Sequence, residues 1–288
     1  MSSENYSVMK ISEKIHCLKI NFTITISPEK KISRYVNCII IFGEKITLID
    51  SGVKESINII FDYLEKNGRQ SSEIEMLILS HAHPDHIGSA AEIKELTHCK
   101  VMAHLGDRNW IENIKLQNSE RPVPGFFNLV DRSTIIDNFL EDGEYIKCDE
   151  EVNIKIIHAP GHSKGSINVF FQEDKILFTA DSIPVKNDIP NYDNFRDLVQ
   201  SLDFIRTYEN YNTLLTSWSE PLFTKKEIDK FLEDGYEYLK LLDQTVKQNY
   251  IGEESETLEF CKKVISQLNL SPVFVMPIVD KAFRSHLI

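Results

Sequence analysis

Cysteine is scarce in this sequence, and the few cysteines present do not form pairs. Five cysteines occur in 288 residues, an odd number, and no two of them are arranged as C-x-x-C. Widely spaced, unpaired cysteines are typical of a reduced cytoplasmic protein and argue against a disulfide-stabilised fold. Cys38, Cys99 and Cys261 fall within apolar runs, so we interpret them as small buried hydrophobic residues rather than nucleophiles.

Long hydrophobic runs are also absent. No segment approaches the ~20 consecutive apolar residues that a membrane-spanning helix requires. Residues 1–14 begin with a polar stretch and contain no apolar region of the kind found in a signal peptide. We therefore expect a cytoplasmic protein that does not bind a membrane.

Positive charge is in deficit. Aspartate and glutamate number 44 against 32 lysines and arginines, which gives a net charge of −12. A strongly acidic chain repels polyanions, so we expect no nucleic-acid partner and favour a small-molecule substrate. The hydrophobic fraction of 42% is that of an ordinary globular protein with a sizeable core.

Strand-like and helix-like segments alternate along the chain. Runs of β-branched and aromatic residues predict strands, and apolar residues at the helical spacing predict helices. This alternation implies a layered sandwich with helices outside the sheets. Strands are expected at residues 15–26, 36–42, 45–49, 76–79, 100–103, 152–157, 166–171, 175–178 and 213–215, and helices at 57–64, 88–96, 108–116, 195–208, from 224 onward and at 256–268.

The pattern weakens between residues 105 and 145, where Arg121-Pro122-Val123-Pro124-Gly125 marks a loop. This stretch either borders a functional site or is a surface excursion without substrate contact. Farther on, Thr224-x-x-Glu227 is a capping box that begins a long helix. We expect a catalytic domain at residues 1–222 and a helical extension at 223–288 packed on the same domain. The extension either caps the site or pairs two subunits as a homodimer.

Ligand-type side chains are concentrated in His81-Ala82-His83-Pro84-Asp85-His86, directly after the buried strand at 76–79. Residues two apart in an extended segment point to the same side, so His81 and His83 can present two imidazoles to one metal ion. Asp85 and His86 follow where the chain turns into a helix, and they can face a second ion close by. Four ligand-type residues within six positions predict a metal site.

This cluster resembles the H-x-H-x-D-H motif of the metallo-β-lactamase superfamily, and three further segments resemble that family in the same order. They are Leu48-Ile49-Asp50-Ser51-Gly52, His158-Ala159-Pro160-Gly161-His162-Ser163-Lys164-Gly165-Ser166 and Phe178-Thr179-Ala180-Asp181. The resemblance covers about residues 15–220. It implies an α/β fold, an αββα sandwich of two mixed β-sheets flanked by helices, with extra C-terminal helices.

The resemblance also implies a metal centre. Asp50 would orient the ligands by hydrogen bonds, although an Asp before Ser51-Gly52 also suits a simple turn. The implied ligands are His81, His83 and His162 for a first ion, and Asp85, His86 and a bridging Asp181 for a second.

Imidazole and carboxylate ligands suit Zn²⁺, as one or two ions, and iron or manganese also fits them. Such ions lower the pKa of a bound water to about 7 and polarise the oxygen of an ester, lactone, thioester or related group. The resemblance therefore implies a hydrolase similar to the glyoxalase II and lactonase types. Asp85 would orient the metal-activated water, and the catalytic metal ligands would be His81, His83 and His162.

The sequence departs from the family at one position. The family's last ligand of the second ion is a histidine after the final strand, and Trp218 aligns there. An indole N–H only donates hydrogen bonds and cannot ligate a cation. Three alternatives stay open: a second site with three protein ligands, a single-metal enzyme, or a substitute ligand. Glu220 and His286 are the candidates for the last, and His286 lies where a frayed terminus is expected.

Two other functions remain as alternatives. The same ligand types suit a non-haem iron redox protein, such as a sulfur dioxygenase or a diiron oxygen-binding protein. The missing histidine also suggests a protein that uses the fold for binding only. A true β-lactamase is not expected, because those enzymes act outside the cytoplasm and this sequence has no export signal.

Overall fold

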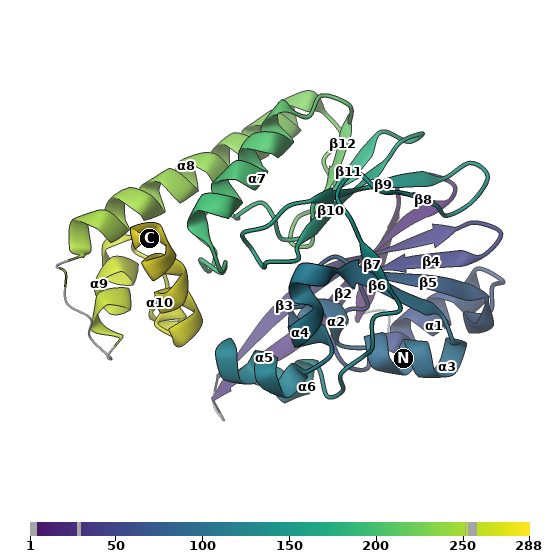
Figure 1. Cartoon of the computed structure of the whole chain (residues 1–288), viewed down its shortest axis with the longest axis horizontal. Coiled ribbons are helices and arrows are strands. Elements are labelled where there is room, and N and C mark those ends of the chain that lie inside the picture. Colours follow the sequence, from purple (N-terminus) through teal and green to yellow (C-terminus); the bar gives the residue numbers. More distant parts are fainter. Residues whose placement is uncertain (1–4, 28–29, 251, 253–257) are drawn as a thin grey trace.

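The computed structural model describes residues 5–27, 30–250, 252 and 258–288. Two mixed sheets face each other, and helices cover the outer face of each (Figure 1). This arrangement is the expected αββα sandwich. Among the described residues, no helix combines the length and the apolar character needed to cross a bilayer.

The first sheet has the order β1-β2-β3-β4-β5-β6-β7. Its first four strands pair antiparallel, and β4 to β7 pair parallel, because helices connect most of the later strands. The strands are β1 (Tyr6–Lys10), β2 (Ile15–Ser27), β3 (Lys30–Phe42), β4 (Ile46–Ile49), β5 (Ile74–Leu79), β6 (Lys100–His104) and β7 (Asn138–Leu140).

The second sheet has the order β12-β11-β10-β9-β8 and is antiparallel except for the pair β11 and β12. Its strands are β8 (Tyr145–Lys147), β9 (Asn153–His158), β10 (Ile167–Phe171), β11 (Ile176–Phe178) and β12 (Thr213–Leu215).

Alternation along the strands separates two hydrophobic layers. On β3, Ile39 and Ile41 face the second sheet and join the core between the sheets, whereas Cys38 and Ile40 face the helices. Successive side chains of a strand point to opposite faces, so both faces of this sheet must be apolar to be covered. The predicted apolar run is therefore explained by a strand that is buried on both sides.

Ten α-helices are present among the described residues. Those of the first half are α1 (Ser56–Lys66), α2 (Pro84–Ile87), α3 (Ala90–Thr97), α4 (Arg108–Ile111), α5 (Ile114–Glu120) and α6 (Phe126–Leu129). Those of the second half are α7 (Phe195–Thr207), α8 (Lys225–Asn249), α9 (Glu259–Gln267) and α10 (Pro277–Arg284).

Several elements differ from the prediction. The helix expected at 88–96 is α3, and the single turn α2, with Pro84 at its first position, precedes it. The helix expected at 108–116 is instead two short helices, α4 and α5, and Asn113 caps the start of the second. The strand expected at 36–42 begins at Lys30, in a long hairpin with β2 that carries polar residues. Strands β1, β7 and β8 and helices α2, α6 and α10 were not predicted, since each is short and lacks a long apolar pattern. The predicted start of α9 at 256 lies outside the described residues.

The C-terminal extension shares a core with the second sheet. Helices α8, α9 and α10 pack with α7 in one hydrophobic cluster that also includes Leu177 and Leu214 of the sheet. Thr224 and Glu227 form the predicted capping box at the start of α8, with the Thr224 side chain accepting from the Glu227 backbone N–H. Figure 1 shows these helices lying together at the end of the sandwich opposite to α1 and α3.

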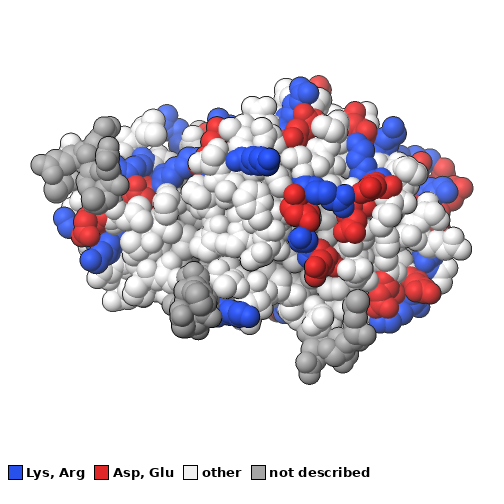
Figure 2. Space-filling view, turned by 90° about the horizontal axis from the view of Figure 1, so that it is seen from below, with Lys and Arg blue, Asp and Glu red and all other residues white. Residues whose placement is uncertain are grey.

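Charge is unevenly distributed over the lower face of the molecule. Figure 2 shows acidic and basic side chains gathered at the left end and over the right half of this face, with a broad, largely uncharged area between them. Charge attracts polyionic partners over distance. Within the described part of this face, the central area offers little such attraction.

We propose that residues 223–288 unfold together with residues 1–222 as one unit. Phe283 of α10 is fully buried in the shared cluster, so Phe283→Ala should lower the free energy of unfolding by about 3–5 kcal/mol. Phe223→Ala is the control, because Phe223 is 50% exposed and its loss should cost less than about 0.5 kcal/mol. Equilibrium denaturation followed by circular dichroism measures both. Two separate transitions in the unaltered protein would contradict the proposal.

Candidate metal centre

The ends of buried strands deliver the site residues. Strand β5 ends at Leu79, and Ser80 leads directly into the predicted histidine cluster, where His83 precedes α2. His162 follows β9, and Asp181 follows β11 of the second sheet. The site therefore lies where loops from both sheets meet at one edge of the sandwich.

Four of the predicted ligands form a tight group. One ligand atom from each of His81, His83, His162 and Asp181 lies within 4.8 Å of the other three. Nε2 of His162 is 3.3 Å from Oδ2 of Asp181, about the separation of two ligands on one tetrahedral zinc ion. The structure thus brings together the three histidines predicted for the first ion and the predicted bridging carboxylate.

The remaining two predicted ligands lie on the other side of Asp181. Nε2 of His86 is 3.3 Å from Oδ1 of Asp181 and 3.7 Å from Oδ2 of Asp85. The two oxygens of Asp181 therefore face different histidines: Oδ2 faces His81 and His162, and Oδ1 faces His86. This is the arrangement that a bridging carboxylate between two ions requires.

Potential ligand atoms without a hydrogen-bond partner provide a test of whether a cation fits this site. Buried polar atoms in folded proteins almost always have a hydrogen-bond partner. Here five buried atoms of the site lack one: Nε2 of His81, His83, His86 and His162, and Oδ1 of Asp181. Unpaired nitrogen and oxygen atoms that converge in one place are the ligands that zinc or iron binds, so the residues present fit a metal ion.

Hydrogen bonds to the opposite ring nitrogen orient two of these histidines, His81 and His86. Nδ1 of His86 donates to Oδ2 of Asp50 at 2.8 Å. Nδ1 of His81 lies 3.0 Å from the hydroxyl of Ser80, which itself donates to Asp50. A proton on Nδ1 leaves the lone pair of Nε2 free for a cation. Asp50 therefore makes hydrogen bonds that orient the histidines, as the resemblance to the family implied.

The backbone of Asp50 is itself unusual. Its φ is 63°, in the left-handed region, which Asp adopts more readily than most residues. Its backbone N–H donates to Ile78, and its carboxylate accepts from the N–H and hydroxyl of Ser80. Sparsely populated backbone conformations often occur at functional sites, where the surrounding structure fixes them. The turn after β4 is thus built to aim this carboxylate.

A second buried carboxylate, Asp107, joins the two histidine-bearing loops. It accepts hydrogen bonds from the N–H of Ala82 at 2.7 Å, the hydroxyl of Ser163 at 2.6 Å and the N–H of Gly165 at 2.8 Å. Ala82 lies between the first two histidines, and Ser163 follows the third. Asp107 therefore fixes the spacing between the loops. Sequence analysis missed it, because no spacing pattern distinguishes it from a surface Asp.

A glycine permits the close approach of α7 to the His162 loop. Gly161 has a φ of 125°, which residues with a side chain rarely adopt. A Cβ at this position would lie 2.2 Å from the backbone nitrogen of Leu198. The carbonyl of Gly161 also accepts from the N–H groups of Asp193 and Asn194, immediately before α7. The position of His162 is thus coupled to the start of that helix.

Burial decides the charge of two of the histidines. It lowers the pKa of His81 and of His83 well below the usual value of an imidazole. Both rings are therefore neutral at ordinary pH, and the neutral form is the one that ligates a metal.

The charges of His86 and Asp181 depend on one another. Burial opposes the charged form of His86, but the neighbouring carboxylates of Asp181, Asp50 and Asp85 outweigh it and raise the pKa well above its usual value. Burial likewise opposes the charge of Asp181, but His86 and His162 hold its pKa well below the usual range. The carboxylates thus demand positive charge at this position, which a proton or a cation can supply.

Trp218 lies beside Asp181, near the place where the family's histidine was expected. Its Nε1 donates to Oδ2 of Asp181 at 2.7 Å. Its ring is stacked by the guanidinium of Arg34 at 4.7 Å, and Arg34 forms a two-pronged pair with Asp188. The indole therefore orients the carboxylate by a hydrogen bond and adds no metal ligand.

Neither candidate substitute ligand reaches the site. Glu220 is exposed and pairs with Lys19. The expected frayed position of His286 is wrong: its side chain is buried, with Nε2 bonded to the hydroxyl of Tyr192 and Nδ1 3.1 Å from Asp243. Neither Glu220 nor His286 can therefore replace the family's missing histidine as a metal ligand.

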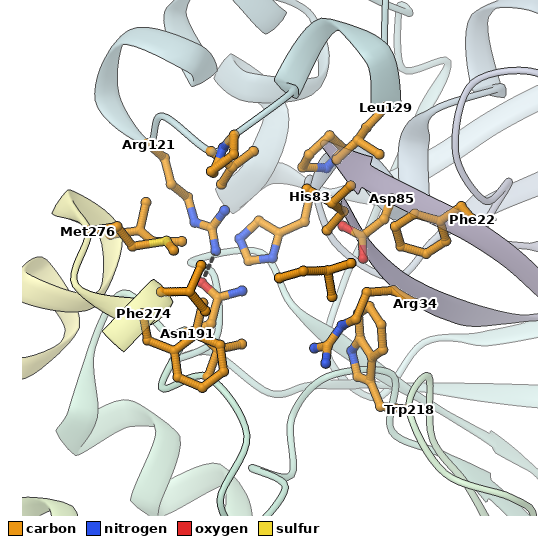
Figure 3. Close-up of a pocket in the computed structure, with 18 of the residues that line it drawn as sticks. Phe22, Arg34, His83, Asp85, Arg121, Leu129, Asn191, Trp218, Phe274 and Met276 are labelled. Carbon is orange, nitrogen blue, oxygen red and sulfur yellow. Dashed lines mark hydrogen bonds between the residues drawn. The ribbon is translucent and has the colours of Figure 1, made fainter. Parts of the chain in front are cut away.

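A pocket of about 270 Å³ opens beside His83, Asp85 and Trp218 (Figure 3). The segment between residues 105 and 145 contributes Arg121, Val123 and Leu129 to its wall, so that segment borders the site rather than forming a remote excursion. The C-terminal extension contributes Phe274 and Met276, so the extension caps the site, as one of its two predicted arrangements requires.

Arg121 is the second residue that sequence analysis missed. It is 3% exposed, and its guanidinium lies beside the ring of His83 (Figure 3). It donates to Oδ1 of Asn191, and its Nε is 3.9 Å from Asp193. The loop motif that contains it was recognised, but a buried Arg is apparent only once the loop is placed.

Comparison with known families identifies the chain. Residues 33–221 match the family model described as the metallo-beta-lactamase superfamily. Because this match covers more than half of the sequence, the chain belongs to the metallo-beta-lactamase superfamily. The match includes all six of the predicted ligands.

Individual relatives are more distant. The probable metallo-hydrolase YqgX of Bacillus subtilis is 28% identical over 156 residues, which are 52% of this chain and 63% of the relative. The hydroxyacylglutathione hydrolase GloC of Haemophilus influenzae is 29% identical over 149 residues, or 50% and 60%. The chain thus spans less than two thirds of the length of these relatives.

Solved structures support the fold. A beta-lactamase domain protein from Burkholderia ambifaria superposes with a TM-score of 0.72 over 100% of this chain and 88% of its own, at 14% identity. At this identity the likeness establishes the αββα fold alone.

We expect Asp107→Ala to lower the free energy of unfolding by about 3 kcal/mol, because it leaves buried donors of both histidine loops unpaired. Asp131→Ala is a matched control: Asp131 is 40% exposed and pairs with Lys54 on the surface, so its loss should cost less than about 1 kcal/mol. Urea denaturation measures both. Equal effects of the two substitutions would show that Asp107 does not hold the loops.

Proposed function

We propose that this protein is a metal-dependent hydrolase that acts on a small ester, lactone or thioester. The observation that carries the proposal is the set of five unpartnered donor atoms beside an apolar pocket. The names of the relatives, a probable metallo-hydrolase and a hydroxyacylglutathione hydrolase, support this class of reaction.

The metal centre would consist of two ion sites that share one carboxylate. A bound divalent ion, zinc being the one that suits these donors best, lowers the pKa of water to about 7 and polarises a carbonyl oxygen. Iron and manganese fit the same nitrogen and oxygen ligands. The first ion would be held by His81, His83, His162 and Asp181, and the second by Asp85, His86 and Asp181.

The chain's own residues position the reaction. Asp85 lines the pocket, and its side chain is 15% exposed, so it is placed to accept a hydrogen bond from a water next to the substrate. Asp50 and Asp107 hold the histidine rings and their loops. Apolar walls on the far side of the pocket exclude bulk water, which strengthens the electrostatic interactions within the site.

Metal content tests the ligand assignment. His162→Ala should lower the content of bound metal by about one ion per chain and lower hydrolysis by more than about 100-fold. His158→Ala, four residues away, is the matched control, because His158 stacks on His104 and bonds to Lys164 outside the metal group. Elemental analysis of protein purified without added metal, together with turnover of a panel of lactones, thioesters, esters and phosphodiesters, measures both.

Different outcomes separate the alternatives. Metal-loaded protein that turns over no member of the panel would count against a hydrolase. Stoichiometric iron with an oxygen-dependent absorption spectrum would instead favour redox chemistry on the same ligands.

Trp218 tests the second ion. In Trp218→His, an imidazole replaces the donor beside Asp181, so we expect the affinity for the second ion to rise by at least about tenfold. Trp218→Phe is the control, because it removes the hydrogen bond to Asp181 without supplying a ligand. Titration with zinc, followed by calorimetry, measures the two binding steps. An unchanged second step in Trp218→His would show that this position lies too far from the ion.

A further inference from the structure

The pocket beside the metal centre has one polar end and two facing apolar walls. Strands β2 and β3 supply Phe22, Ile24 and Ile32. The segment after α9 crosses the pocket opposite these strands and supplies Val273, Phe274 and Met276. Figure 3 shows Phe22 on one side of the cavity and Phe274 with Met276 on the other. Side chains from the two ends of the chain thus enclose one apolar space.

The two apolar walls from β2 and from residues 273–276 lie outside the part of the chain that matches the family. The match begins at residue 33 and ends at residue 221. Phe22 and Ile24 precede it, and Phe274 and Met276 follow it. These parts of the apolar enclosure are therefore built by segments that the family model does not cover, whereas the predicted metal ligands all lie within it.

The polar end of the pocket is formed by His83, Asp85, Arg121 and Asn191. Two arginines line the cavity, but they differ in charge balance. Arg34 is paired on both prongs with Asp188, at 2.9 and 3.1 Å. The nearest carboxylate of Arg121 is 3.9 Å away, on Asp193, which Lys281 also contacts. Arg121 forms no such two-pronged pair with any described residue, so N–H groups of its guanidinium can also donate to an oxygen of a ligand.

We propose that the pocket binds an acyl group of medium length, with its hydrocarbon chain between β2 and residues 273–276 and its carbonyl or carboxyl oxygen facing Arg121. The inference rests on the proposed function for the reacting bond, which would lie beside His83 and Asp85. It narrows the substrate to an ester, lactone or thioester of an apolar carboxylic acid.

Binding of the free acids tests the pocket without requiring turnover. Calorimetry on the full-length protein as purified, titrated with octanoate and with butyrate, isolates the chain, because both acids carry the same carboxylate. Burial of each methylene should tighten binding by up to about fourfold, so octanoate should bind more than tenfold tighter than butyrate. Equal affinities would overturn the proposal.

Substitutions in the pocket walls test where the hydrocarbon chain of the acid binds. Phe274→Ala should weaken octanoate by about tenfold and leave butyrate unchanged, because only the longer chain reaches that wall. Ile24→Trp fills the pocket from the opposite wall and should exclude octanoate while butyrate still binds. Phe223→Ala, at an exposed aromatic outside the pocket, is the control. Loss of both acids in parallel, or of neither, would contradict the assignment.

The polar end has its own test. Arg121→Gln should weaken octanoate and butyrate by the same factor, and octyltrimethylammonium should not bind to the unaltered protein. Circular dichroism of each variant verifies its fold. Octanoate binding without turnover of any ester would overturn the hydrolase and leave the pocket assignment intact. Turnover of short and long esters at equal rates would overturn the pocket assignment and leave the hydrolase intact.

Discussion

Unpaired buried nitrogen and oxygen atoms constrain the centre of this protein. Four imidazole nitrogens and a carboxylate oxygen face one another without a hydrogen-bond partner, an arrangement that costs free energy until a cation satisfies it. Hydrogen bonds from neighbouring residues hold these side chains in place despite that free-energy cost. Asp50 fixes the ring of His86 directly and the ring of His81 through Ser80. The hydrophobic core of the sandwich keeps the ends of the strands in register.

Two buried aspartates divide the work of positioning. Asp50 acts on ring orientation, whereas Asp107 acts on the distance between the loop of His81 and His83 and the loop of His162. Neither would be a ligand, yet each determines whether lone pairs from separate strands converge. Trp218 adds a third constraint through Asp181. An indole in this place keeps the carboxylate oriented and would leave a second ion with fewer protein ligands.

The C-terminal extension contributes both to the hydrophobic core and to the wall of the pocket. Its helices complete the core over the second sheet, and the segment between α9 and α10 forms one wall of the pocket. A protein whose metal ligands follow a common pattern can thus acquire its own specificity from segments outside that pattern. The physical reason is that the ligands sit on short loops after buried strands, while the pocket depends on whatever packs over them.

Sequence alone predicted nine of the twelve described strands, the six ligand candidates and the capping box of α8, because period-two patterns, ligand spacing and helix caps are local. It also located the departure at Trp218. Only the tertiary structure decided that Arg121 is buried, that Asp107 joins two loops, and that His286 packs against Tyr192 instead of fraying. These features depend on contacts between residues far apart in the chain. No local pattern encodes such contacts, since burial and partner choice are set by packing.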